Sequence, residues 1–303
     1  MSDRTFLDRT LRRLHRLATG RGRGLAETLS PGLADDDLPR LEAAIRGCLE
    51  ARGGAVSALA RAAELSEAYL RLDEEGRGRF IVLLAEAFGI DSRRLDNAAR
   101  LQLQGAAGAE AALREALEPP RVALFRQLGG LPDGVKFLVD LRAELRDLAL
   151  DEVVRKAVDG ELKDLLASWF DVGFLELRRI TWDSSADLLE RLIAYEAVHE
   201  IRSWSDLKNR LDSDRRCFAF FHPRMPEEPL IFVEVALTSG LAGDMATLLD
   251  EAAPALDPAE ADTAIFYSIS NAQQGLAGIS FGDFLIKRVV DLLRAEFPGL
   301  RTF

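Results

Sequence analysis

Apolar residues recur every three to four positions through most of the first half of the chain. This spacing predicts amphipathic α-helices from residue 34 to about residue 168. Helices are expected within 35–54, 55–72, 79–90 and 134–150, and alanine is abundant there while β-branched runs are scarce, as helix propensity favours. The clearest apolar stripe comprises Val135, Leu138, Leu141, Leu145 and Leu148. No fixed-period repeat occurs, so an irregular helical bundle is predicted rather than a solenoid.

The pattern changes near residues 169–182, after which three runs are rich in aromatic and β-branched residues. These runs, 217–222, 229–237 and 264–270, predict strands. Residues 224–228 have the length of a hairpin connection between the first two. Before them, Asp183, Ser184 or Ser185 can cap a helix. The apolar stripe of that helix comprises Leu188, Leu189, Leu192 and Ile193.

The 303 residues suit two domains. We therefore predict an α+β protein, with a helical domain over 1–168 and a domain over 169–303 in which helices cover a sheet.

Charge and composition narrow the class of function. The net charge of −11 and the pI of about 5.0 disfavour a sequence-independent nucleic-acid binder, which needs a basic surface. No apolar run approaches the ~20 residues that a membrane span requires. Cys48 and Cys217 match no zinc spacing and are interpreted as reduced thiols, so neither a metal site nor a disulfide is expected. A cytoplasmic protein is the working expectation.

The first 24 residues are rich in arginine, and their leucines fall at helical spacing. A transit peptide is one interpretation, but such peptides are poor in acidic residues and rich in serine. A surface helix of the mature protein is therefore preferred.

Residues 268–290 pass from a strand to a glycine-rich segment and then to an amphipathic helix. Gly275, Gly278 and Gly282 allow close approach of a ligand, and the N–H groups at a helix start favour an anion. A phosphate cradle with backbone donors from Ala277 to Asp283 is one reading, and a helix cap that needs glycine for packing is the other. The segment matches neither a Walker loop nor a dinucleotide fingerprint.

Other candidate groups have structural interpretations. His15 is expected to be solvated, His199 to cap helix carbonyls, and His222 to orient a turn. Ser268 and Ser270 alternate on a strand, but no neighbouring base is evident that would make either a nucleophile. Lys287 and Arg288 either meet phosphates or lie on a solvated helix face, which is preferred.

Three long segments together resemble the malonyl-CoA decarboxylase family. They are "FYSISNAQQGLAGISFGDFLIKRVVDLLRAEFPGL", "RRCFAFFHPRMPEEPLIFVEVALT" and "WFDVGFLELRRITW" with the following "YEAVHEIRSWSDLKNRL". The resemblance is close over residues 169–303 and looser over the helical half. It implies a helical oligomerisation domain, hence a homo-oligomer, and an acetyltransferase-like (GNAT-like) catalytic domain that converts malonyl-CoA to acetyl-CoA and CO2. No separate cofactor is implied, because coenzyme A is part of the substrate.

The family's malonyl-CoA-binding loop falls on seven consecutive residues of this chain: Ala277, Gly278, Ile279, Ser280, Phe281, Gly282 and Asp283. Some relatives carry glutamate where this chain has Ser280, so a carboxylate role does not transfer. The family's catalytic serine and histidine match nothing up to Phe303 and are expected beyond it. By itself the 303-residue chain is therefore expected to be inactive. Two alternatives stay open: a GNAT-type acyltransferase, and a non-catalytic assembly module with a coenzyme A-binding appendage.

Overall fold

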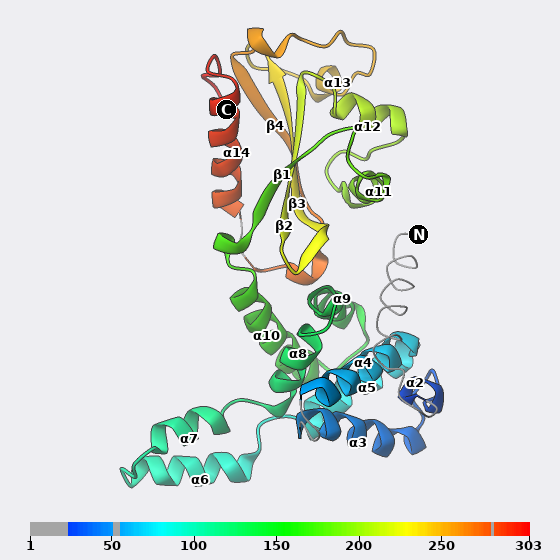
Figure 1. The fold of residues 1–303 in the computed structure, drawn as a ribbon, viewed down its shortest axis with the longest axis vertical. Coiled ribbons are helices and arrows are strands. Elements are labelled where there is room, and N and C mark those ends of the chain that lie inside the picture. The colour runs from blue at the N-terminus through cyan, green and yellow to red at the C-terminus, as the bar shows by residue number, and fades with distance from the viewer. Residues whose placement is uncertain (1–23, 51–54, 280–281) are drawn as a thin grey trace. The chain divides into compact units, whose positions relative to one another are not determined.

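The computed structural model describes residues 24–50, 55–279 and 282–303, and the chain divides between Ser168 and Trp169 into two compact units. The helix expected within the first 24 residues, with His15, lies outside the described residues. Each unit is described by itself (Figure 1).

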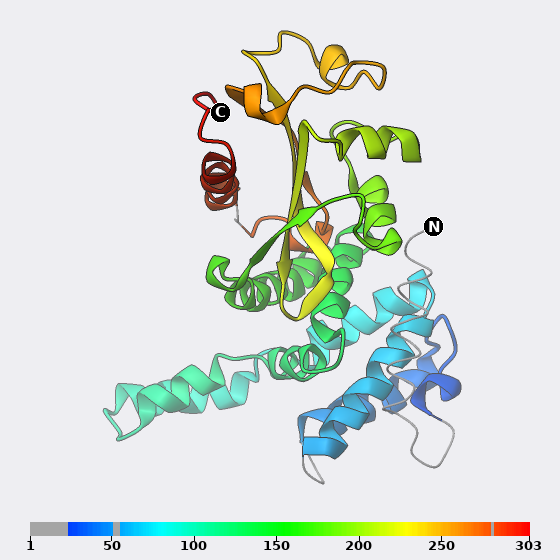
Figure 2. The ribbon, with the colours of Figure 1, turned by 45° about the horizontal axis from the view of Figure 1, so that its top comes forward.

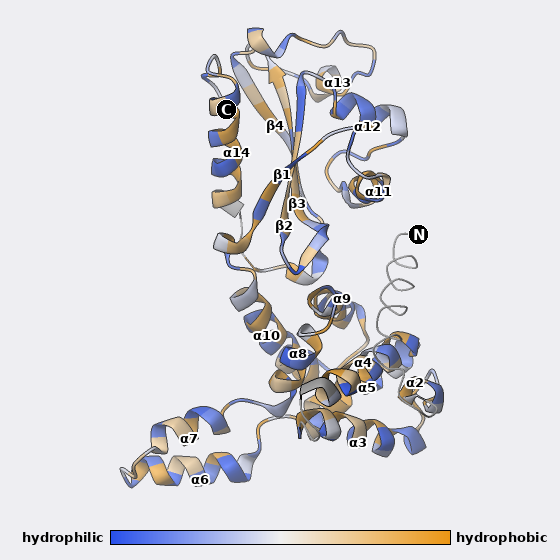
Figure 3. Ribbon diagram, viewed as in Figure 1, coloured by the Kyte–Doolittle hydropathy of each residue, from blue (hydrophilic) through white to orange (hydrophobic). Residues whose placement is uncertain are grey.

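Helices make up the first unit. After the short α2 (Leu25–Thr28) and a 3₁₀ turn (Asp35–Asp37) come α3 (Leu38–Leu49), α4 (Ala55–Arg71), α5 (Glu74–Ala87), α6 (Ser92–Leu103), α7 (Ala109–Ala116), α8 (Pro120–Gly129), α9 (Gly134–Asp147) and α10 (Glu152–Trp169). The predicted α9 stripe is confirmed, because all five of its residues are buried. Helices such as α10 carry both hydrophobic and hydrophilic residues along their length, as one-sided packing requires (Figure 3).

Helix α5 begins five residues before the predicted start at Arg79. The Asp73 side chain accepts the N–H of Gly76, and Glu74 and Glu75 occupy the first turn, where acidic groups are favourable. Gly76 packs against another segment, since a Cβ there would lie 2.1 Å from the Pro31 carbonyl oxygen. The N-terminal signals, rather than the apolar stripe, therefore set this boundary.

Buried polar contacts join the helices of the first unit. The Arg121 side chain donates to both carboxylate oxygens of Glu161 and to the carbonyl oxygens of Leu84 and Ala85 near the end of α5. The Tyr69 hydroxyl donates to Glu144 at 2.8 Å. The first contact joins α8 to α5 and α10, and the second joins α4 to α9. Helices α6 and α7 pack on each other as a hairpin (Figure 1).

The second unit is built on a four-stranded antiparallel sheet in the order β1-β2-β3-β4. Its strands are β1 (Glu176–Ile180), β2 (Arg215–His222), β3 (Met225–Thr238) and β4 (Thr263–Asn271), and its helices are α11 (Ala186–Tyr195), α12 (Trp204–Arg210), α13 (Met245–Leu248) and α14 (Gly282–Glu296). Short 3₁₀ turns lie at Val172–Phe174, Pro258–Glu260 and Gln274–Leu276. The three predicted strands are confirmed.

Helices cover both faces of this sheet. In Figures 1 and 2, α11 and α12 lie on one side and α14 on the other. Leu189, Leu192 and Leu207 pack in one core cluster with Cys217, Phe221 and other residues of the sheet. Every residue of β2 is buried, as expected for a central strand covered on both faces. Of the predicted caps for α11, Ser185 is the one whose side chain accepts a helix N–H, that of Leu188.

The connection between β2 and β3 is shorter than predicted, because β3 begins at Met225. Only Pro223 and Arg224 separate the strands, and His222 pairs directly with Met225. Register shifts on either side of Phe221 absorb the residues after Met225. The extra residues that had indicated a longer loop thus lie in the strand as a bulged region.

Candidate functional site

The segment between β4 and α14 (residues 272–281), here called the β4–α14 loop, has a buried stem. Ala272, Gln273, Gly275 and Leu276 are buried. The N–H of Ala272 donates to the Leu230 carbonyl oxygen, and the Gln273 side-chain amide donates to that of Pro229, both at 2.9 Å. Contacts with β3 therefore tether the base of the loop.

The tip of the loop contains a tight turn over residues 276–279. The N–H of Ile279 donates to the Leu276 carbonyl oxygen at 3.0 Å. Ala277 has φ −56° and ψ 134°, and Gly278 has φ +78°. These are the angles of a type II turn, whose third position favours glycine. A local backbone requirement therefore explains Gly278 whether or not a ligand binds.

The structure places the seven predicted loop residues unevenly. Ala277 and Gly278 are exposed and Ile279 is half-buried, whereas Ser280 and Phe281 lie outside the described residues. Gly282 and Asp283 begin α14. The turn uses the N–H groups of Ala277, which donates to Gln274, and of Ile279. Among the described residues of the segment, the candidate donors that these bonds do not use are Gly278, Gly282 and Asp283, the last two in the first turn of α14, where helical N–H groups have no intrahelical acceptor.

Helix α14 behaves as an ordinary amphipathic helix. Leu285, Val289 and Leu293 are buried, while Lys287 and Arg288 are exposed. Their exposure agrees with the preferred interpretation of a solvated helix face.

At the end of β4, just before the loop, lies a buried polar network that the sequence analysis missed. Glu196 directly follows α11. The Ser268 hydroxyl donates to its carboxylate and lies 2.8 Å from each of the two carboxylate oxygens, and the Ser270 hydroxyl donates to one of them at 3.1 Å. The sequence analysis identified no base beside these serines, and the structure places the carboxylate of Glu196 there. Because 72 residues separate Glu196 from Ser268, no local sequence signal connects them.

A second carboxylate group lies opposite Ser268 in the sheet register. This group is Glu234, which is 1% exposed. The Arg210 guanidinium lies between two carboxylates, 3.0 Å from that of Glu234 and 2.8 Å from that of Asp206. Burial raises the pKa of Glu234 to about 7, although the Arg210 charge opposes the shift. Burial also raises the pKa of the Cys217 thiol, which suits an unreactive core cysteine.

The remaining histidines have structural contacts. The His222 Nδ1 accepts the N–H of Arg224, and its Nε2 lies 3.1 Å from the Trp169 carbonyl oxygen, so His222 orients the turn as predicted. His199 instead donates its backbone N–H to Glu196. This is a backbone contact and not the carbonyl cap that was predicted for the imidazole ring.

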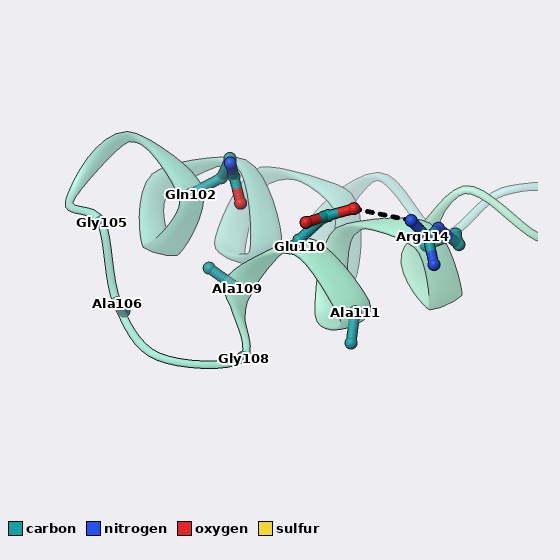
Figure 4. A pocket seen from close by; sticks show the side chains of 8 residues that line it. All are labelled: Gln102, Gly105, Ala106, Gly108, Ala109, Glu110, Ala111 and Arg114. Carbon is teal, nitrogen blue, oxygen red and sulfur yellow. Dashed lines mark hydrogen bonds and ion pairs between the residues drawn. The ribbon is translucent and has the colours of Figure 1, made fainter.

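An open hollow lies at the tip of the α6–α7 hairpin (Figure 4). Small residues line most of it, and its ion pair, Arg114 with Glu110, is largely solvent-exposed. It brings together no group suited to catalysis. Within residues 24–50, 55–279 and 282–303, no cluster of three or more histidine, cysteine or acidic residues could hold a metal ion. Over the same residues no helix has the length and hydropathy of a membrane span.

Two family models match the chain. The model of the malonyl-CoA decarboxylase N-terminal domain matches residues 88–170, and that of the malonyl-CoA decarboxylase C-terminal domain matches residues 173–303. The chain belongs to the malonyl-CoA decarboxylase family. The β4–α14 loop and the buried network both lie within the second match.

Individual members of the malonyl-CoA decarboxylase family agree with this assignment. The mitochondrial malonyl-CoA decarboxylases of goose (Anser anser anser) and mouse (Mus musculus) are 39% and 40% identical over 80% and 79% of this chain. The chain spans only 51% and 50% of their lengths.

Solved structures of the family have the same fold. The malonyl-CoA decarboxylase of Agrobacterium vitis superposes with a TM-score of 0.81 at 42% identity, covering 87% of this chain and 65% of that one. The malonyl-CoA decarboxylase of Rhodopseudomonas palustris superposes with a TM-score of 0.83 at 43% identity, and the match covers 88% of this chain and 66% of that one. At this identity the comparison supports a common fold and agrees with the family assignment.

Proposed function

We propose that this protein is a malonyl-CoA decarboxylase, which releases CO2 from malonyl-CoA and leaves acetyl-CoA. The observation that carries the proposal is the match of residues 173–303 to the family's C-terminal domain, together with a glycine turn placed between β4 and α14. Removal of CO2 leaves an enolate, whose oxygen needs preorganised donors and whose carbon needs a proton. Tight binding of the coenzyme A part of the substrate would hold the thioester beside the hydrogen-bond donors and the proton donor that the reaction needs.

We assign this binding to the segment from Ala277 to Asp283. Its backbone N–H groups, chiefly those of Gly278 and the first turn of α14, would bind the pyrophosphate, which the positive end of the helix dipole also favours. This is the GNAT-like arrangement that the family resemblance implies. Coenzyme A enters as part of the substrate, so the proposal requires no separate cofactor.

The turn offers a matched test of the coenzyme A assignment. Gly278→Val places a branched side chain at the exposed tip of the loop. We expect this variant to bind coenzyme A more weakly, with a Kd at least about tenfold higher by calorimetry. Gly240→Val is the control, since Gly240 also has a positive φ (+80°), lies in another loop, and has no atom within 4 Å of the point where a Cβ would lie. Equal affinity of folded Gly278→Val and wild type would refute the cradle.

The reaction itself is tested on the whole protein, because this chain spans about half of its goose and mouse relatives. Incubation with malonyl-CoA and no amine acceptor should yield CO2 and acetyl-CoA. Acetyl or malonyl transfer that needs an amine would favour the acyltransferase alternative instead. Coenzyme A binding without either reaction would favour the non-catalytic assembly module.

We further propose that the helical unit forms a homo-oligomer. The family resemblance supports this, as do exposed leucines on the α6–α7 hairpin, among them Leu103, which is 88% exposed. We also propose a cytoplasmic location for this protein, whereas the goose and mouse relatives are named as mitochondrial.

A further inference from the structure

We propose that Glu196 is a positioning residue that fixes the register in which β4 enters the β4–α14 loop. The inference rests on the proposed function, because it concerns the loop to which coenzyme A binding is assigned. It gives the buried carboxylate a role that the sequence did not suggest.

The need for such a residue follows from an irregularity in β4. Glu234 pairs with Ser268, but the next residue of β3, Val235, pairs with Phe266. Tyr267 is therefore an extra residue in β4, which makes a bulge. A bulge interrupts the ladder and bends the strand, and a one-residue slip would turn every following side chain to the opposite face.

Glu196 contacts β4 immediately after this bulge. Ser268 and Ser270 alternate with Ile269, so their hydroxyls share one face, and both donate to Glu196. Ile269 is 41% exposed on the other face. A slip by one residue would present Ile269 to the carboxylate, which would lose its hydroxyl donors. The contact therefore specifies one register.

The other side of Glu196 is also fixed. Its Oε1 accepts the backbone N–H groups of Val198 and His199, both at 2.8 Å. The Arg210 side chain, held by Asp206 and Glu234, donates to the Glu200 carbonyl oxygen. The Arg210 contact thus ties the segment that carries Glu196 to a point outside β4, while the Ala197 N–H also donates to the Ser270 hydroxyl at 3.4 Å. The segment can therefore position the strand.

The stem of the loop begins directly beyond these serines. Ala272 has the same strand parity as Ser268 and Ser270 and packs in the core cluster of α11. From Ala272 the chain reaches the turn at Gly278 in six residues, most of them buried. A shift in register at Ser270 would therefore also displace the turn at Gly278, because the short, largely buried stem leaves little room for compensating changes.

Glu196→Gln tests the proposal on the 303-residue chain. The amide retains the size of the side chain but replaces one acceptor oxygen with a donor, so the serine hydroxyl at that position must accept instead of donate, and the hydrogen bonding that holds β4 is altered. We expect the Kd for coenzyme A to rise about tenfold, with faster hydrogen exchange in residues 269–279. Ser270→Ala removes the contact with Glu196 from the other side, together with the longer contacts of Ser270 with Ala197 and Ser268. It should produce a change in the same direction, and it remains informative if Glu196→Gln does not fold.

Glu144→Gln is the matched control. Glu144 is likewise a carboxylate that accepts a hydroxyl, from Tyr69, although it is only partly buried, and it belongs to the first unit. It should lower stability without altering coenzyme A affinity or exchange in 269–279. Failure of the wild type to bind coenzyme A would refute the proposed function, while the exchange measurement would still test the register. Unchanged affinity and unchanged exchange in a folded Glu196→Gln or Ser270→Ala protein would overturn the inference.

Discussion

At the scale of the residue, Glu234 makes the stability of the second unit dependent on pH. Its carboxyl group is buried against Arg210, and burial raises its pKa from 4.5 to about 7. The folded protein therefore holds this proton more tightly than the unfolded chain does. The stabilisation from this group is complete below about pH 4.5 and is lost as the pH rises through about 7.

Glu234→Gln should remove that slope. The glutamine mimics the protonated acid, so the fall in the free energy of unfolding between pH 5 and pH 8, on the order of 1–3 kcal/mol for this group, should be absent from the variant. Denaturant unfolding of the second unit at several pH values measures it. Glu260→Gln, at an exposed glutamate, should keep the wild-type slope. An unchanged slope in Glu234→Gln would show that other groups set the pH dependence.

At the scale of the element, periodicity and composition predicted several helices and three of the four strands, but neither β1 nor the residue at which each element begins. The α9 stripe and the three strands followed from spacing and composition alone. The start of α5 depends on the Asp73 cap, and the early start of β3 depends on its pairing with His222. Glu196 could not be predicted, because its partners are brought to it only by the packing of α11 on the sheet.

Two helical glycines distinguish tertiary packing from intrinsic propensity. A Cβ added at Gly160 in α10 would have no atom within 4 Å. Because alanine favours the helix more than glycine does, Gly160→Ala should raise the free energy of unfolding by about 0.5–1 kcal/mol. Gly76→Ala in α5 gains the same propensity but places its Cβ 2.1 Å from the Pro31 carbonyl oxygen. We expect a net loss of stability, because backbone must move to relieve the contact. Chemical denaturation of both variants gives the comparison, and a stabilising Gly76→Ala would contradict the packing.

At the scale of the whole molecule, the exposed leucines of the α6–α7 hairpin bear on self-association. Leu103 and Leu117 are 88% and 50% exposed, and α6 and α7 pack chiefly on each other. Contacts with another copy would remove these side chains from water, which is favourable.

The double variant Leu103→Glu, Leu117→Glu should therefore lower the mass of the oligomer in sedimentation experiments. Charged groups would have to be buried in the interface, a cost that exceeds the loss of the apolar contact itself. Leu241→Glu is the control, since Leu241 is 80% exposed in the second unit. An unchanged mass for the double variant would place the oligomer contact elsewhere.

The two-residue turn between β2 and β3 has a consequence for the rate at which the second unit folds. Closing this turn orders few residues before strand pairing is gained, whereas 34 residues separate β1 from β2 and 24 separate β3 from β4. Loop-closure entropy grows with the length of the connection. The β2–β3 hairpin is thus the kinetically favoured nucleus, and the outer strands join it later. During synthesis the central hairpin can form before β4 has been made, so the loop that follows β4 is among the last parts of the unit to acquire its shape.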